Sequence, residues 1–279
     1  MPPLNLVILG GGNMARALAL GGSRSGVLDP RTVVIVEPDP AKHAAFVQKS
    51  IRCHESIDQL AAAESGRLPR DAEVLLAVKP QVLAAAGEQF TRAFHGFEGV
   101  VISILAGIPS EKVRSAMGQG SRVIRAMPNT PASISQGATA VAAGAGARPG
   151  DDTFAMRLFT GIGPVVVRVP ESLMDAVTAL SGSGPAYLFY LAEAMTRGGT
   201  EAGLPPEVAD RLTRQTLAGA AALLAGSHAE SPADLRAAVT SKGGTTEAAC
   251  RLLDQRDVPR AIIDAIAAAR DRGRELGSA

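Results

Sequence analysis

Short apolar runs alternate with helical stretches along the first half of the chain. Several runs are continuous Val, Ile and Leu, which is typical of strands that helices cover on both faces. Between them, helices are predicted at Asn13–Ser25, Pro40–Lys49 and Pro109–Met117. This alternation predicts an α/β fold with a mainly parallel, doubly wound sheet. The predicted strands are Leu4–Leu9, Thr32–Val36, Glu73–Val78, Val100–Ile104, Val123–Ala126, Thr139–Ala142 and Val165–Val169.

After Val169 the strand pattern ends and only helical patterns follow. They are rich in Ala, Leu and Arg, with Pro and Gly at the joints. We therefore expect a Rossmann-type dinucleotide-binding domain over residues 1–169 and an all-α domain for dimerisation and substrate binding over residues 170–279. The predicted helices are Glu171–Ala202, Pro206–Ala225, Pro232–Val239, Thr246–Asp254 and Val258–Leu276.

The helical half has few large side chains with which to form a core. Aromatic residues make up 3% of the chain and Trp is absent, so Ala and Gly must fill much of the interior. Such a half is poorly equipped to stand alone, and a homodimer with interleaved helices is the natural expectation. A monomeric cap on the first domain is the alternative.

Composition excludes several other classes of protein. The formal net charge is +1 without a basic cluster, so nucleic acid is not an expected partner. Cys53 and Cys250 lie far apart without metal-like spacing, so no metal is expected. Two cysteines are also too few for a disulfide framework. The N-terminus lacks the basic region of a signal peptide, and no apolar stretch reaches the roughly 18 residues of a membrane span. A cytoplasmic protein is expected.

A glycine-rich segment follows the first predicted strand and opens the first predicted helix. Gly10-Gly11-Gly12-Asn13-Met14-Ala15 has the form G-x-G-x-x-A, a variant of the dinucleotide-binding fingerprint. Gly10 permits a tight turn, Gly12 removes a side chain that would block the pyrophosphate, and Ala15 lets the helix lie close to the sheet. The helix N-terminus favours the negative diphosphate. The pattern predicts an NAD or NADP site.

Glu37 ends the second predicted strand, where a Rossmann fold usually contacts the adenosine ribose. A carboxylate there accepts hydrogen bonds from the ribose hydroxyls and repels a 2′-phosphate. Asp39 adds a second negative charge, whereas Lys42 is near enough in sequence to reduce the repulsion. The residues favour NADH over NADPH, unless Glu37 points into solvent.

Two further segments end predicted strands and so become candidates for the nicotinamide half of the cofactor. They are Ala77-Val78-Lys79-Pro80 and Leu105-Ala106-Gly107. In doubly wound folds, ligands bind outside the carboxyl ends of the strands. From the residues alone, Lys79 fits a solvated surface lysine as well as a ligand-binding one.

The segments around Gly10–Ala15 and Ala77–Pro80, with three others, resemble the pyrroline-5-carboxylate reductase family. The resemblance covers nearly the whole chain, in the family's order. Its most specific parts are Asp175–Tyr187 and Val239–Ala249, which Rossmann dehydrogenases in general lack. It implies reduction of 1-pyrroline-5-carboxylate to L-proline with NAD(P)H, and the expected homodimer, or an assembly of such dimers, would be the active form. The matching runs are LNLVILGGGNMA, AVKP, RVIRAMPNTP, DAVTALSGSGPAY and VTSKGGTTEAA.

The resemblance also implies roles for individual residues. Cofactor contacts are expected from Gly10–Ala15 and from the backbone of Ala77, Val78, Lys79 and Pro80, with Ala106 beside the nicotinamide. Glu171 matches a position near the substrate, and Ser181–Pro185 is expected in the pocket wall and dimer core. The substrate-carboxylate loop is expected to be Ser241, Lys242, Gly243, Gly244, Thr245 and Thr246.

That loop precedes a predicted helix, so its N–H groups can form an anion cradle. A plain helix N-cap by Thr245 or Thr246 is the alternative. Two positions depart from the family pattern. Relatives commonly carry Ser, Arg or Asn in place of Glu37, which suits NADPH. Ala238 stands where some relatives have Asn, so one cofactor contact is not expected here.

Imine reduction needs little acid–base chemistry if the ring nitrogen arrives protonated. We expect Thr246 to hydrogen-bond that nitrogen and Glu171 to favour its positive charge. One rival is a β-hydroxyacid dehydrogenase, which would need a lysine base early in the helical half, but no lysine lies between Lys112 and Lys242. A non-catalytic nucleotide-sensing domain is the second rival, and it would not need the Ser241–Thr246 loop.

Overall fold

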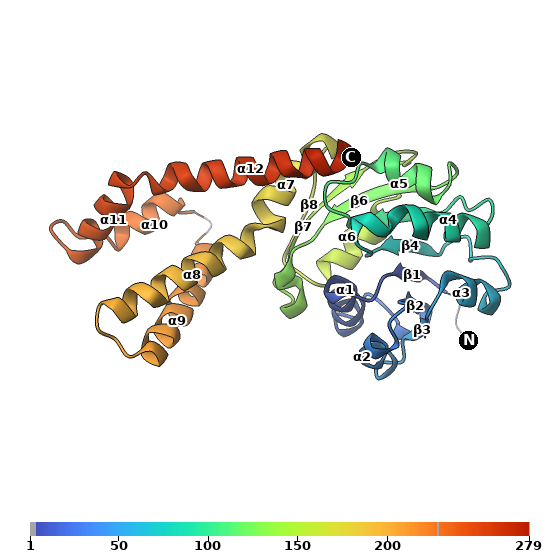
Figure 1. The fold of residues 1–279 in the computed structure, drawn as a ribbon, viewed down its shortest axis with the longest axis horizontal. Helices are drawn as coiled ribbons and strands as arrows, with labels where there is room; N and C mark the ends of the chain where they lie inside the picture. The colour runs from blue at the N-terminus through green and yellow to red at the C-terminus, as the bar shows by residue number, and fades with distance from the viewer. Residues whose placement is uncertain (1–3, 228, 279) are drawn as a thin grey trace. The chain divides into compact units, whose positions relative to one another are not determined.

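The computed structural model describes residues 4–227 and 229–278, and its strands, all between residues 6 and 168, form one eight-stranded sheet (Figure 1). The strand order is β3-β2-β1-β4-β5-β6-β7-β8, and neighbours are parallel except β6 and β7. The predicted, mainly parallel sheet is confirmed. The strands are β1 Leu6–Leu9, β2 Val33–Val36, β3 Arg52–His54, β4 Glu73–Leu76, β5 Val100–Ser103, β6 Arg122–Met127, β7 Ala138–Ala143 and β8 Val165–Arg168.

Helices cover both faces of this sheet, as a doubly wound fold requires. Successive residues of a strand point to opposite faces, so Leu6 and Ile8 enter one core and Val7 and Leu9 the other. The first core also contains residues of α1 (Asn13–Arg24), α2 (Ala44–Val47) and α6 (Thr153–Thr160). The second contains residues of α3 (Ile57–Ala63), α4 (Leu83–Ala93) and α5 (Ser110–Met117).

Two parts of this first half differ from the sequence prediction. The strand β3 was not predicted, because its three residues are polar or half-buried and form no apolar run. The helix predicted at Pro40–Lys49 is a 3₁₀ turn, Pro40–Lys42, followed by the single turn of α2. Pro40 begins this segment, and Ser50, with φ +62, ends it, so the helix cannot extend in either direction.

The second half is helical, as predicted, but its first helix is broken. The expected helix Glu171–Ala202 is a 3₁₀ turn (Glu171–Leu173), α7 (Met174–Val177), a π-helical turn (Thr178–Gly182) and α8 (Gly184–Glu201). The remaining helices are α9 (Pro206–Gly226), α10 (Pro232–Ala238), α11 (Thr245–Gln255) and α12 (Val258–Ser278). Within residues 4–227 and 229–278, none of the helices combines the length and apolar character needed to cross a bilayer.

The compact units of the structure do not divide at the expected boundary between residues 169 and 170. One unit comprises Met1–Ser183 with Ala269–Ala279, and the other comprises Gly184–Ala268. The segment after residue 170 stays with the first unit because Met174 is fully buried beside Met127 and Ala140. The last turns of α12 belong to the first unit as well.

Glu73, the first residue of β4, makes the stability of the fold dependent on pH. Burial, reinforced by the charge of Asp151, raises its pKa to about 8, and its Oε2 has no hydrogen-bond partner among the described residues. The folded chain therefore keeps a proton that the unfolded chain loses near its ordinary pKa of 4.5. The stabilisation is complete below that value and is lost as the pH rises to about 8.

We expect the free energy of unfolding to fall by roughly 2–5 kcal/mol between about pH 5 and about pH 8. Glu73→Gln should remove most of this fall, because the amide stays neutral. Urea denaturation of both proteins across this pH range measures the difference. An equally steep fall in Glu73→Gln would assign the pH dependence to other groups.

Candidate active site

The turn between β1 and α1 takes the chain tightly out of the sheet. Gly10 has φ +102, and a Cβ on it would lie 2.7 Å from the carbonyl oxygen of Ala77. Any side chain at this position would therefore collide with the backbone after β4. Ala15, in the first turn of α1, is fully buried against the sheet, so a larger residue would push the helix away.

Gly12 leaves open space above the N-terminus of α1. It is the N-cap of the helix, with an extended backbone (φ −70, ψ −175) that any residue can adopt. A Cβ on it would meet no heavy atom of the described chain within 4 Å. The N–H groups of Asn13 and Met14, in the first turn, have no intrahelical acceptor, and the helix dipole favours an anion there. Space and donors together fit the diphosphate of a dinucleotide.

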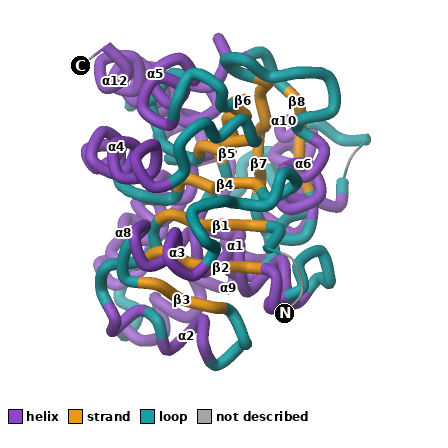
Figure 2. Tube along the Cα trace, turned by 90° about the vertical axis from the view of Figure 1, so that its right-hand side faces the viewer, coloured by secondary structure: helices purple, strands orange, loops and turns teal. Residues whose placement is uncertain are grey.

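The predicted cofactor residues lie at the carboxyl ends of neighbouring parallel strands. Figure 2 shows β2, β1, β4 and β5 in succession. Glu37 follows β2, Gly10–Ala15 follow β1, Ala77–Pro80 follow β4, and Ala106 lies in the loop after β5. The fold thus brings them together along the edge where open α/β sheets bind ligands. The side chain of Lys79 is exposed, which is compatible with both roles expected for it.

Glu37 lies against the glycine-rich turn and does not point into solvent. Its Oε2 accepts a hydrogen bond of 2.7 Å from the Gly11 N–H, and its Oε1 accepts one of 3.1 Å from the Asp39 N–H. Lys42 Nζ lies 2.9 Å from Oε1, so the expected compensating charge is present. Burial raises the pKa of Glu37, but the hydrogen bonds from Lys42 and the two backbone groups outweigh it and hold the pKa below its usual value. The carboxylate stays charged beside the turn.

Glu171 lies within the first unit, bonded to the start of α5. Its Oε1 accepts from the Ser110 N–H at 2.8 Å, and its Oε2 accepts from the Ser110 hydroxyl at 2.6 Å. Arg125 Nη1, on β6, lies 3.2 Å from Oε1. The Ser110 oxygen in turn accepts from the Ala145 N–H at 2.9 Å. Both oxygens of the Glu171 carboxylate therefore already have partners in the protein.

Ser110 and Arg125 were not predicted from the sequence as partners of Glu171. Arg125 is 5% exposed, and its Nη2 has no hydrogen-bond partner in the described chain. A charged residue inside the apolar run of β6 was the available signal. Ser110 follows Pro109 at the start of a predicted helix. At such a position a serine suggests a helix N-cap and gives no sign of a bond to Glu171.

The Ser241–Thr246 loop belongs to the second compact unit and connects α10 to α11. Gly243 has φ +74, and its N–H donates to Glu247 Oε2 at 2.7 Å. Gly244 donates to the carbonyl of Ser241 at 3.0 Å, and a Cβ on it would lie 2.5 Å from Ser241 Oγ. The positive φ therefore favours glycine at position 243, and a side chain at position 244 would displace the Ser241 hydroxyl.

The helix after this loop begins without a threonine cap. Gly244 is the N-cap of α11, and no described side chain makes a capping hydrogen bond there. Thr245 and Thr246 instead occupy the first turn of α11, with Thr245 exposed and Thr246 half-buried. The alternative of a plain cap by either threonine is therefore wrong. Their N–H groups are at the positively polarised end of the helix.

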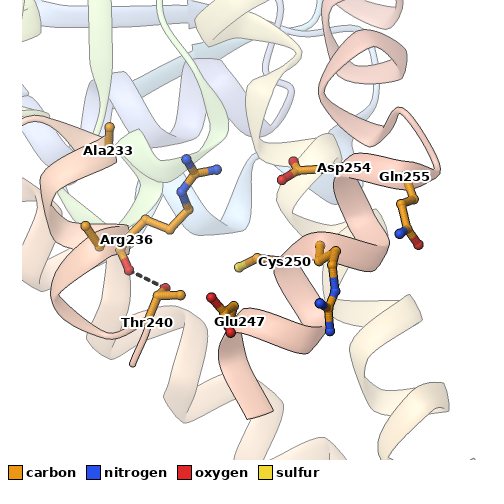
Figure 3. A pocket seen from close by; sticks show the side chains of 9 residues that line it. Ala233, Arg236, Thr240, Glu247, Cys250, Asp254 and Gln255 are labelled. Atoms are coloured by element: carbon orange, nitrogen blue, oxygen red, sulfur yellow. Dashed lines mark hydrogen bonds between the residues drawn. The ribbon is translucent and has the colours of Figure 1, made fainter. Parts of the chain in front are cut away.

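A groove of about 690 Å³ runs between α10 and α11 next to this loop. Figure 3 shows Arg236, Glu247 and Cys250 along it, and the Thr240 hydroxyl donates to the carbonyl of Arg236 at 2.6 Å. Glu247 thus borders the groove and also holds the loop through Gly243. The loop geometry is fixed by residues of its own unit.

Comparison with known proteins covers both halves of the chain. The family model for pyrroline-5-carboxylate reductase dimerisation matches residues 171–276, and the model for NADP oxidoreductase coenzyme F420-dependent matches residues 5–107. The chain is 39% identical to a pyrroline-5-carboxylate reductase of Synechocystis sp. over 274 residues, covering 98% of both chains. It is 37% identical to that of Pseudomonas aeruginosa, covering 97% of this chain and 96% of the relative. The solved structure of a pyrroline-5-carboxylate reductase from Coxiella burnetii matches with a TM-score of 0.85 at 33% identity, covering 98% of both chains.

Proposed function

The chain belongs to the pyrroline-5-carboxylate reductase family, and from this premise we propose that it reduces 1-pyrroline-5-carboxylate to L-proline with a hydride from NAD(P)H. The observation that carries this proposal is the similarity to curated reductases along the full length of the chain. Reduction adds a hydride to the imine carbon and leaves the ring nitrogen as an amine, so one proton must accompany the substrate. The dimerisation region makes the enzyme a homo-oligomer.

The residues of the first unit fit a bound dinucleotide. When bound, the nicotinamide supplies the hydride. The open position at Gly12 and the N-terminus of α1 would take the diphosphate, and Glu37 would face the adenosine ribose. Ala77–Pro80 and Ala106 would border the nicotinamide half. The protein's contribution is then largely positioning, which can supply up to roughly 7–11 kcal/mol in favourable cases.

The Ser241–Thr246 loop is the proposed site for the substrate carboxylate. The Gly243 N–H is held by Glu247 and the Gly244 N–H by Ser241. We therefore assign the anion to the N–H groups of Thr245 and Thr246 and to the dipole of α11. The hydroxyl of Thr246 would hydrogen-bond the ring nitrogen. Arg125 already compensates the charge of Glu171. The contacts of Glu171 therefore support a role in positioning α5 more than one in stabilising the positive charge on the ring nitrogen of the substrate.

The test of this function is loss of NAD(P)H absorbance on addition of 1-pyrroline-5-carboxylate, with L-proline identified as the product. A nucleotide-sensing protein would bind the cofactor and not oxidise it. A β-hydroxyacid dehydrogenase would reduce NAD(P)⁺ with a hydroxyacid and leave the imine untouched. Either result would refute the proposal.

Thr246→Val should lower kcat by at least about tenfold, because it removes the hydroxyl and keeps the shape of the side chain. Thr246→Ser should keep most of the activity. Thr245→Val is the matched control on the same turn of α11, and its kcat should stay within about threefold of wild type. Steady-state kinetics at saturating cofactor measure all three. A wild-type kcat in Thr246→Val would exclude the hydroxyl from the reaction.

We also propose that the enzyme prefers NADH. Glu37 and Asp39 lie near the expected ribose site, and Lys42 balances only one of the two charges. At an effective dielectric near 20, two unit charges about 4 Å apart repel by about 4 kcal/mol. Because Lys42 is half-exposed and pairs with Glu37, the discrimination against a 2′-phosphate should be smaller.

Glu37→Ser should therefore shift the ratio of kcat/KM for NADPH over NADH upward by at least tenfold, about 1.4 kcal/mol. Lys42→Ala should shift it in the opposite direction, because it leaves the carboxylate uncompensated. The ratio is the measurement, so a general loss of activity does not support the proposal. If the wild-type enzyme already uses NADPH better than NADH, the assignment of Glu37 to the ribose is wrong.

A further inference from the structure

The last turns of α12 lie directly against the loop after β5. In Figures 1 and 2 the end of α12 is next to α5. Gly107 has φ +75, and a Cβ on it would lie 2.7 Å from the carbonyl oxygen of Gly273 and 3.0 Å from Leu276 Cβ. A Cβ on Gly277 would lie 2.5 Å from the carbonyl oxygen of Gly107. Helix and loop thus approach as closely as two backbones without side chains allow.

Three other contacts fix the same loop and the end of the helix. Gly277 also faces Pro109, whose Cδ would lie 3.4 Å from an added Cβ. Leu276 lines a groove of about 900 Å³ together with Pro80 and Ile108. Just beyond the loop, the Glu171 carboxylate holds the N–H and the hydroxyl of Ser110. The end of α12 therefore packs directly on the loop after β5, and it borders one groove together with Pro80, which follows β4.

These two segments are the ones that border the nicotinamide in the proposed function, on which this inference rests. Ala106 immediately precedes Gly107, so a displacement of Gly107 moves Ala106. We propose that Gly277 is a positioning residue for the reaction. Its missing side chain lets the C-terminal helix seat the Ala106–Gly107 loop, and this contact sets where the nicotinamide ring lies relative to the substrate. The adenosine half of the cofactor is held by other residues, on Gly10–Ala15 and near Glu37.

The test is Gly277→Ala, with Gly273→Ala as its matched control on the same face of α12. An added methyl on Gly277 meets the backbone of the loop at 2.5 Å, whereas one on Gly273 meets the side chain of Asp175 at 3.3 Å. Both changes replace a glycine of α12 by alanine, and Gly273 lies one turn before Gly277. Dissociation constants are measured for NADH and for ADP-ribose, which lacks the nicotinamide, and kcat is measured with 1-pyrroline-5-carboxylate.

We expect Gly277→Ala to lower kcat or to weaken NADH binding by at least tenfold while ADP-ribose binding changes less than twofold. Gly273→Ala should stay within threefold of wild type in all three quantities. Equal losses for NADH and ADP-ribose would indicate a merely structural effect and overturn the proposal, as would unchanged values in a folded Gly277→Ala. If Gly277→Ala does not fold, Leu276→Ala is the deciding variant. We expect it to lower kcat or NADH affinity by at least threefold more than it lowers ADP-ribose affinity. Equal effects on NADH and ADP-ribose with an unchanged kcat would overturn the proposal. An inactive wild type would refute the reductase function alone, because the two dissociation constants still report on the loop.

Discussion

Gly12→Val is expected to weaken the binding of NADH and NADPH by at least about 100-fold, or about 2.7 kcal/mol, while the chain stays folded. The backbone at Gly12 is extended, and a Cβ there meets no described atom within 4 Å beyond its chain neighbours, so a side chain at this position has open space to enter. The Val side chain instead fills the space that the diphosphate needs above α1. Titration of each cofactor, followed by the fluorescence of its reduced nicotinamide, measures the loss.

Gly10→Ala provides the contrast in the same turn. The φ of +102 and the 2.7 Å approach to Ala77 make any side chain at Gly10 costly to the fold itself. Gly10→Ala should therefore lower the thermal stability and the cofactor affinity together, whereas Gly12→Val lowers only the affinity. Normal cofactor binding in a folded Gly12→Val would remove this turn from the cofactor site.

Phe189→Asp should raise the dissociation constant of the homo-oligomer by at least about 100-fold and abolish most of the activity. The second unit carries large apolar side chains on its surface, and α8 has no buried residue among those described. Phe189 is 63% exposed and its neighbour Tyr190 is 76% exposed. If a second copy covers this helix, an unpaired carboxylate on each subunit would be buried at a cost of several kcal/mol. Light scattering at the assay concentration, with parallel activity measurements, tests the expectation.

Val47→Asp is the matched control for this substitution. Val47 is also a large apolar residue with 58% exposure, but it lies on α2 in the first unit. We expect Val47→Asp to leave both the oligomer and the activity close to wild type. A fully active monomer of Phe189→Asp would show that the pocket needs no second subunit.

The sequence predicted those elements whose physical cause is local. Continuous Val, Ile and Leu runs identified the buried strands, because a strand covered on both faces has no polar side. The tight turn at Gly10 was predicted, and the space above Gly12 is open, whereas the role of Gly12 toward a cofactor stays a prediction. Glu37 was placed at the correct strand end. Its hydrogen bond to Gly11 depends on where the turn packs, so it could not be inferred.

The parts that could not be predicted depend on contacts between distant residues. The bonds from Ser110 and Arg125 to Glu171 join residues that are 61 and 46 positions apart. No local pattern marks such a pair. Residues 171–183 have helical sequence, yet they stay with the sheet because Met174 is buried there. Helical periodicity gives the type of an element, and packing decides to which unit the element belongs.

The first unit is discontinuous in sequence, since its final piece is Ala269–Ala279. During synthesis, the sheet and the glycine-rich turn leave the ribosome long before the helical end that supports Gly107. The loop after β5 therefore receives that support only when the whole chain has been made. A fragment that stops after Ser183 would contain every strand of the sheet and still lack the helix against which this loop rests. Expression of the nucleotide-binding half alone should thus give a unit in which the loop after β5 lacks this support. Adding the last helix as a separate peptide would restore it.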